Sequence, residues 1–150
     1  EFQKLITNEK LLEHAEVFNN YYGSSKDIVI EKLNKGENVI FDIDWQGTEQ
    51  IIKKKLNYKI YTIFILPPSR EELFKRLLNR DQNDEKTANE RMKQFEKDVL
   101  HWNDYDFVVI NDDLQKCYSQ IINFIEKSKL DSNTYYDKSH IEKHIELLIK

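Results

Sequence analysis

The sequence contains few of the residues that cross-link a chain or mark special turns, with one cysteine, three glycines and two prolines among 150 residues. The single cysteine, Cys117, excludes a disulfide bond within the chain, and we expect a reducing compartment, the cytoplasm. Long hydrophobic runs are also absent: segments such as 39–41 and 63–66 fall far below the ~20 apolar residues that a membrane span needs. The first residues show no signal-peptide pattern, and we expect no membrane association.

The chain also lacks an excess of positive charge. It has 23 lysines and arginines against 27 acidic residues, a formal net charge of −4. Proteins that coat nucleic acids usually show a basic excess, so we expect no nucleic-acid polymer as a partner. Hydrophobic residues make up 39% of the chain, which is enough for a folded core in a domain of this length.

Patterns typical of helices and strands alternate from residue 28 to residue 127, and this order predicts an α/β protein with a parallel sheet. Ser69 and Glu72 form the pattern of a capping box, which predicts that a helix starts there. Residues 80–85 and 131–137 are expected to be connections. The other expected helices are 2–8, 26–35 (stopped by Gly36), 47–55, 85–101, 113–127 and 138–149. The expected strands are 11–18, 38–44, 60–66 and 107–110, and residues 21–25 are expected to form a short strand or a loop.

Two aspartates lie at the end of the first strand that we expect to be buried. Asp42 and Asp44 end the segment 38–44, which is apolar on both faces and therefore typical of a buried parallel strand. Ligands of open α/β sheets bind beyond the carboxyl ends of the strands, where two carboxylates suit a magnesium–phosphate site or a ligand amine. The alternative is a pair that caps the next helix, and the pattern alone favours neither interpretation.

Three arginines form a candidate phosphate clamp. Arg76 and Arg80 lie four residues apart on one expected helix and therefore share a face, and Arg91 lies on the next helix. Arginine binds phosphate through its planar fork and neutralises the charge of a transferred phosphoryl group. The alternative is a solvated charged face, and the spacing alone favours that alternative.

Glu13, Tyr22 and Ser24 place a carboxylate and two hydroxyls among apolar strand residues. A carboxylate in a half-apolar strand needs a partner, and the N–H groups of a purine would serve. The alternative is a solvated glutamate on an edge strand, which the pattern alone favours. His140 and His144 have the spacing of a metal pair, but no third ligand stands out, so we expect no metal site of the protein's own. Cys117 lies on an apolar helix stripe and is expected in the core.

Taken together, several segments resemble guanylate kinases, and the tail resembles bacterial members. The resemblance covers about residues 1–127 and is specific because independent motifs keep their order and spacing. The matching segments are 12–18, 20–24, 41–47, 63–69 and 109–113, with Arg76, Arg80 and Arg91 between the last two.

The resemblance implies a P-loop nucleoside-monophosphate-kinase fold, in which helices flank a parallel sheet. It also implies ATP-dependent phosphorylation of GMP to GDP in purine nucleotide metabolism, with Mg²⁺ accompanying ATP. The expected parts of the domain are a GMP-binding part (1–36), the core (37–68 and 102–130), a lid region (69–101) and a C-terminal helix (131–150). Whether the protein forms a homo-oligomer is left open.

The resemblance also implies roles for single residues. Glu13 and Ser24 match the residues that bind guanine, and Tyr22 matches a tyrosine that contacts the GMP phosphate. Asp42 and Asp44 match strand-end aspartates near GMP. The remaining matches are the phosphate-binding arginines Arg76, Arg80 and Arg91, and Asn111 near the adenine of ATP.

One part of the family pattern is absent from this sequence. None of the three glycines is followed by lysine, so the phosphate-binding loop GxxxxGK[ST] is not present, and neither is the first core strand that carries it. Without that strand, segments 38–44 and 60–66 would keep unpaired backbone groups. We expect the chain to be part of a longer enzyme and to be inactive alone. The alternative is a non-catalytic guanylate-kinase-like module that binds phosphopeptides; the retained site residues fit it poorly.

Overall fold

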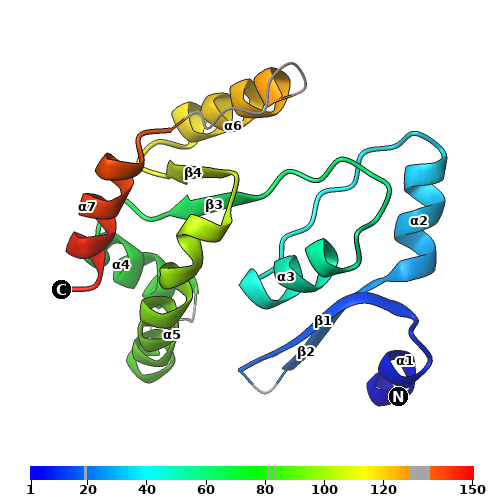
Figure 1. The fold of residues 1–150 in the computed structure, drawn as a ribbon. Coiled ribbons are helices and arrows are strands. Elements are labelled where there is room, and N and C mark those ends of the chain that lie inside the picture. The colour runs from blue at the N-terminus through cyan, green and yellow to red at the C-terminus, as the bar shows by residue number, and fades with distance from the viewer. Residues whose placement is uncertain (19, 81, 83, 129–135) are drawn as a thin grey trace. The chain divides into compact units, whose positions relative to one another are not determined.

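The computed structural model describes residues 1–18, 20–80, 82, 84–128 and 136–150, and it divides the chain into two units, residues 1–60 and 61–150 (Figure 1). The expected connections 80–85 and 131–137 lie partly outside the described residues. Each unit has its own hydrophobic core, and the alternation of strands and helices is the mixed α/β architecture that the sequence predicts.

The first unit is built on an antiparallel hairpin. Its core is formed where β1, α2 and α3 bury Leu12, Val29 and Ile51 against one another. Gly36 has a φ of +79°, the left-handed conformation that ends helices, so the expected stop after α2 is confirmed. The elements are α1 (Phe2–Thr7), β1 (Leu11–Val17), β2 (Asn20–Ser25), α2 (Lys26–Asn34) and α3 (Trp45–Lys53).

The predicted strand over residues 38–44 is wrong. A strand is defined by a ladder of backbone hydrogen bonds to a neighbour, and no described residue pairs with this segment. The side chains still alternate: Val39, Phe41 and Ile43 pack against the core of the first unit, whereas Ile40 is 94% exposed. The apolar pattern therefore reports an extended segment with one packed side rather than a strand buried on both faces.

The second unit is built on a parallel pair of strands, in which Ile63 of β3 lies opposite Phe107 of β4. Helix α7 and the short helix η1 cover the face that carries Leu66 and Val108, and α6 covers the face that carries Val109 (Figure 1). The elements are β3 (Ile63–Leu66), α4 (Arg70–Arg80), α5 (Glu85–Asp98), η1 (Val99–Asp104), β4 (Phe107–Ile110), α6 (Leu114–Ser128) and α7 (Lys138–Leu148).

Strand β3 starts later than the expected segment 60–66, for a local reason. The amide and the hydroxyl of Thr62 both donate to Asp106 Oδ2, at 2.8 and 2.9 Å, so a side chain takes the place of a ladder partner at this position. The strand is also not buried on both faces, because Ile65 is 53% exposed. The expected helix over 85–101 likewise ends at Asp98 and continues as the 3₁₀ helix η1.

Candidate functional site

A β-bulge turns Glu13 into the protein. Between Leu11 and Glu13 the register advances two residues on β1 but only one on β2, from Ser25 to Ser24. The extra residue, Leu12, breaks the alternation of faces, so that Leu12 and Glu13 are both buried, with exposures of 0% and 3%. The alternative of a solvated glutamate on an edge strand is therefore wrong.

The buried Glu13 carboxylate has a hydroxyl partner on the opposite strand. Ser24 lies opposite Glu13 in the hairpin, and its Oγ donates to Glu13 Oε1 at 2.6 Å. An ionised carboxylate has about four acceptor positions, so this single bond leaves capacity for N–H donors of a ligand. The Ser24 oxygen keeps its own lone pairs, so the pair presents acceptors only a few ångströms apart.

Gly47 forms one wall beside this carboxylate. A Cβ atom added at Gly47 would lie only 2.8 Å from Glu13 Oε2, closer than any side chain tolerates without a shift. Asp44 fixes the backbone there, because it caps α3 and its Oδ1 accepts from the Gly47 amide at 2.9 Å. For Asp44 the capping interpretation is therefore confirmed. Gly47 is a site residue that the sequence did not single out, although a glycine in the first turn of a helix was the available signal.

Gln50 holds α3 against the strand that carries Glu13. Its side-chain amide accepts from the His14 amide at 3.1 Å and donates to the His14 carbonyl at 2.7 Å, as a neighbouring strand would. Gln50 therefore positions both Glu13 and Gly47 from one turn of the helix. Sequence reasoning missed this role, because no local pattern shows which backbone a glutamine side chain reaches.

Tyr22 and Asp42 lie near these elements but are open to solvent. Tyr22 pairs with Ala15 in the hairpin, two positions from Ser24 on the same strand, and therefore lies on the same face as Ser24. Its side chain is exposed, as is that of Asp42 in the extended segment before α3. Both are accessible to a ligand.

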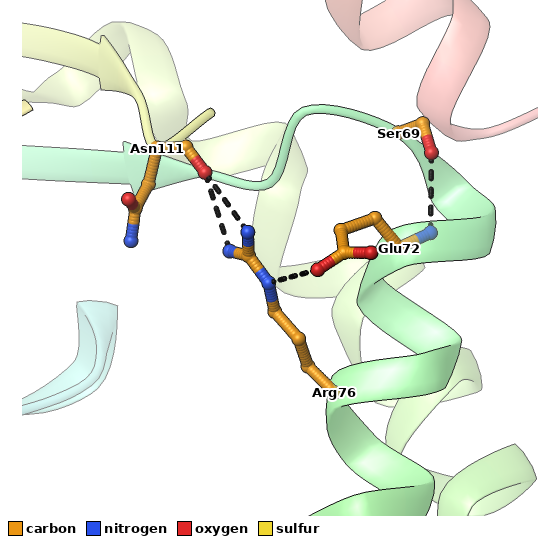
Figure 2. A network of polar contacts seen from close by, with 4 residues as sticks. All are labelled: Ser69, Glu72, Arg76 and Asn111. Atoms are coloured by element: carbon orange, nitrogen blue, oxygen red, sulfur yellow. Dashed lines mark hydrogen bonds and ion pairs between the residues drawn. The ribbon is translucent and has the colours of Figure 1, made fainter. Parts of the chain in front are cut away.

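In the second unit, Arg76 links α4 to the end of β4 (Figure 2). Its Nε donates to Glu72 Oε1 at 2.8 Å, and both Nη1 and Nη2 donate to the Asn111 carbonyl at 3.2 Å. Ser69 Oγ accepts from the Glu72 amide at 3.1 Å, so the serine half of the predicted capping box is confirmed. The guanidinium of Arg76 is thus held in place by the protein itself.

The other candidate residues of this unit differ in exposure. Arg80, at the last position of α4, is exposed, and it makes no ion pair with any residue that the structure describes. Arg91 is half-buried on α5. Asn111 follows β4 directly. At the next residue, Asp112, the carboxyl accepts a hydrogen bond from the Asp113 amide at 2.8 Å, which holds the pKa of that carboxyl below its usual range.

Residues 1–18, 20–80, 82, 84–128 and 136–150 contain no group of three or more His, Cys, Asp or Glu side chains placed to hold a metal ion. His144 instead donates from Nε2 to the Pro67 carbonyl at 2.8 Å, and Cys117 is buried in the core at 3% exposure, as expected. None of the described helices has the length and apolar character needed to cross a membrane.

Comparison with known proteins agrees with the resemblance. A family model described as "Guanylate kinase" matches residues 1–128. Guanylate kinase from Photorhabdus laumondii is 43% identical over 129 residues, covering 86% of the chain and 61% of that protein. Guanylate kinase from Rickettsia prowazekii is 42% identical over 137 residues, covering 91% of the chain and 68% of that protein.

Among solved structures, a crystal structure of guanylate kinase from Anaplasma phagocytophilum aligns with a TM-score of 0.65 at 28% identity. The alignment covers 97% of this chain and 68% of that one. Several of the relatives are longer than this chain, which spans 59% to 62% of their length.

Proposed function

The chain belongs to the guanylate kinase family, and on this premise we propose that the protein transfers the γ-phosphoryl group of ATP to GMP. The observation that carries the proposal is the buried Glu13 carboxylate with the Ser24 hydroxyl at 2.6 Å. A buried carboxylate is costly unless donors satisfy it, and one hydroxyl uses only part of its acceptor capacity.

Guanine has the complementary donors. Its ring N1–H and its exocyclic amino group point the same way and can both donate to one carboxylate, and Ser24 lies beside that carboxylate on β2. Adenine has no N1–H and would present a lone pair to Glu13 instead. A site built to accept hydrogen bonds rejects a ligand that lacks the donors, so this pair supports selection of GMP over AMP.

The arginines of the second unit supply the charge that phosphates require. Arg80 is exposed at the end of α4 and is available to an anionic ligand, while Arg91 lies half-buried on α5. Fixed cations stabilise the charge of a transferred phosphoryl group. Arg76 is the third member, and its bonds to Glu72 and Asn111 set its position before any nucleotide arrives.

Three further residues are proposed to contact the nucleotides: Tyr22 the GMP phosphate, Asp42 the surroundings of GMP, and Asn111 the adenine of ATP. Asp44 is proposed to act beside them through the α3 cap. Mg²⁺ neutralises phosphate charge when it arrives with ATP. The described residues offer no cluster of three His, Cys, Asp or Glu ligands for it.

The proposed parts of the domain follow from these roles. We assign residues 1–36 to the GMP-binding part, residues 37–68 and 102–130 to the core, residues 69–101 to the lid region and residues 131–150 to the C-terminal part, which contains the helix α7 (Lys138–Leu148). This division is functional and differs from the two structural units, whose boundary along the chain falls between residues 60 and 61.

The test is a coupled assay of ADP formation by the complete gene product, with GMP and with AMP as acceptors. We expect turnover with GMP and little with AMP. Glu13→Gln should lose most of the turnover with GMP, whereas Glu16→Gln should keep it, because Glu16 is an exposed residue of the same strand. Binding of GMP without turnover would contradict the kinase proposal and favour a non-catalytic module.

A further inference from the structure

The C-terminal helix α7 lies beyond the part of the chain that the family model matches, residues 1–128. It is nevertheless integral to the second unit. Ile141, Ile145 and Leu148 of α7 are at most 5% exposed and pack against Leu66 and Val108 of the two strands. The helix therefore packs on the sheet, and this packing sets which of its side chains face the neighbouring elements.

One of these polar side chains reaches the turn between β3 and α4. The Leu66 carbonyl accepts from the Asn111 amide at 2.8 Å, and the next carbonyl, that of the buried Pro67, accepts from His144 Nε2 at 2.8 Å. A carbonyl can only accept, so the proton of the imidazole must be on Nε2. A buried carbonyl needs a partner, and two consecutive prolines offer no N–H here. His144 supplies that partner.

A second contact joins α7 to the first residue of α4, directly after this turn. Arg70 Nη1 donates to the carbonyl of Leu148, the last residue of α7, at 3.1 Å, and its Nη2 pairs with Glu96 at 2.5 Å. A cation in the first turn of α4 is unfavourable for that helix, whereas a cation at the carbonyl end of α7 is favourable. The position of Arg70 is thus explained by α7 and Glu96 rather than by α4.

We propose that His144 is a positioning residue, which fixes through the Pro67 carbonyl the turn from which α4, the helix of Arg76 and Arg80, begins. The inference rests on the proposed function for its catalytic consequence, because Arg76 and Arg80 are the residues that it places. Arg70 reinforces the same turn. In this arrangement α7 serves as the support of the arginine helix as well as a cover for the sheet.

The first test is hydrogen–deuterium exchange of the complete gene product, with His144→Phe, His144→Gln and the control His140→Phe. Phenylalanine keeps the ring and removes the donor, whereas the glutamine amide can place an N–H where Nε2 lies. His140 lies one turn earlier on α7, is exposed, and its imidazole makes no hydrogen bond to the part of the chain that the structure describes.

The reporter amides are those of Glu72 and Leu73, which donate to Ser69 in the first turn of α4. We expect His144→Phe to speed their exchange about fivefold, the factor for one lost hydrogen bond, and His144→Gln and His140→Phe to exchange like the wild type. Amides in the middle of α6, such as that of Ile121, should not change. Three results would each overturn the proposal: wild-type exchange rates at Glu72 and Leu73 in His144→Phe, an equally large increase in the exchange rates of the α6 amides, or the same fast exchange in His144→Gln.

The second test compares steady-state kinetics of the same variants. We expect His144→Phe to lower kcat about three- to tenfold with a smaller change in KM for GMP, and His144→Gln to restore kcat. An unchanged kcat in His144→Phe would overturn the catalytic consequence. If the wild-type protein does not phosphorylate GMP at all, the proposed function fails, and the exchange experiment still decides whether His144 positions α4.

Discussion

Glu13 and Ser24 face each other across the β1–β2 hairpin with 2.6 Å between Glu13 Oε1 and Ser24 Oγ, and Glu13 is only 3% exposed. The bulge at Leu12 makes this possible, because a regular strand would bury Leu12 and turn Glu13 toward solvent. An irregularity of one residue thus converts an apolar strand into one that carries a buried acceptor.

The first prediction concerns the substitution Glu13→Gln. The glutamine amide keeps one acceptor but replaces the other with a donor, which would oppose an N–H of guanine. We expect GMP binding to weaken by about 1–3 kcal/mol, the cost of a mispaired buried polar group, measured by isothermal titration calorimetry. Glu16→Gln on the same strand should bind GMP like the wild type, since Glu16 is exposed. An unchanged dissociation constant in Glu13→Gln would remove Glu13 from the guanine site.

The second prediction compares two glycines. Alanine usually stabilises a helix relative to glycine, but at Gly47 its Cβ would lie 2.8 Å from Glu13 Oε2. We expect Gly47→Ala to displace the carboxylate and to weaken GMP binding at least tenfold. At Gly36 a Cβ meets nothing within 4 Å, but φ is +79°, so Gly36→Ala should lower stability by about 1 kcal/mol and leave GMP binding unchanged. Equal GMP affinities in the two variants would contradict this assignment.

The sequence predicted elements whose signals are local. The helix periodicity of residues 113–127 and 138–149 is confirmed by α6 and α7, because a stripe of apolar residues needs only one packed face. The segment 38–44 has an equally clear apolar pattern but forms no strand, since a strand depends on a partner that local sequence does not specify.

The candidate site shows the same division. Glu13 was singled out because a carboxylate among apolar residues needs a partner, but the bulge that buries it depends on pairing with β2. Gln50 and His144 were beyond prediction in their observed roles, since each reaches backbone atoms far away in the sequence. Arg76 was predicted as one of three equivalent arginines, yet the structure ties it to Asn111 and leaves Arg80 exposed.

The third prediction concerns the pH dependence of stability. Asp84 caps α5, the helix of Arg91, and the Thr87 hydroxyl and amide donate to it, which lowers the pKa of the Asp84 carboxyl in the folded state. A lowered folded-state pKa means that the ionised cap stabilises the fold above the pKa of the unfolded chain. That contribution is lost as the pH falls through the lower, folded-state value.

Thermal unfolding of Asp84→Asn at pH values from 7 to 3 tests this. Asparagine is also a good cap, so we expect this variant to melt only slightly below the wild type at pH 7. On acidification its melting temperature should fall less than that of the wild type. Asp84→Ala, which cannot cap, should melt lower than the wild type at pH 7, with the difference shrinking toward pH 3. Parallel curves for the wild type and Asp84→Asn would show that Asp84 does not contribute through its charge.

The fourth prediction separates Arg76 from Arg80. Arg76 donates to Glu72 and Asn111, so Arg76→Ala should lower the melting temperature by about 2–4 °C as well as impair activity. Arg80 is exposed and holds no described residue in place, so Arg80→Ala should leave the melting temperature unchanged. Differential scanning calorimetry of both variants measures this contrast, and equal melting temperatures would contradict a tethering role for Arg76.

The expected effect of Arg80→Ala on activity follows from where the charge develops. Arg76 and Arg80 share one face of α4, and two cations at that spacing repel each other unless an anion collects them. The charge on the phosphoryl group is redistributed only during transfer, so an arginine that binds it stabilises the transition state more than the ground state. We therefore expect Arg80→Ala in the complete gene product to lower kcat on the order of 10³-fold, with a much smaller rise in KM.

The control for this prediction is Lys75→Ala, which removes an exposed cation from the same helix. It should keep kcat within about twofold, because Lys75 lies off the face of the two arginines. A near-normal kcat in Arg80→Ala would assign this arginine to the solvated charged face instead.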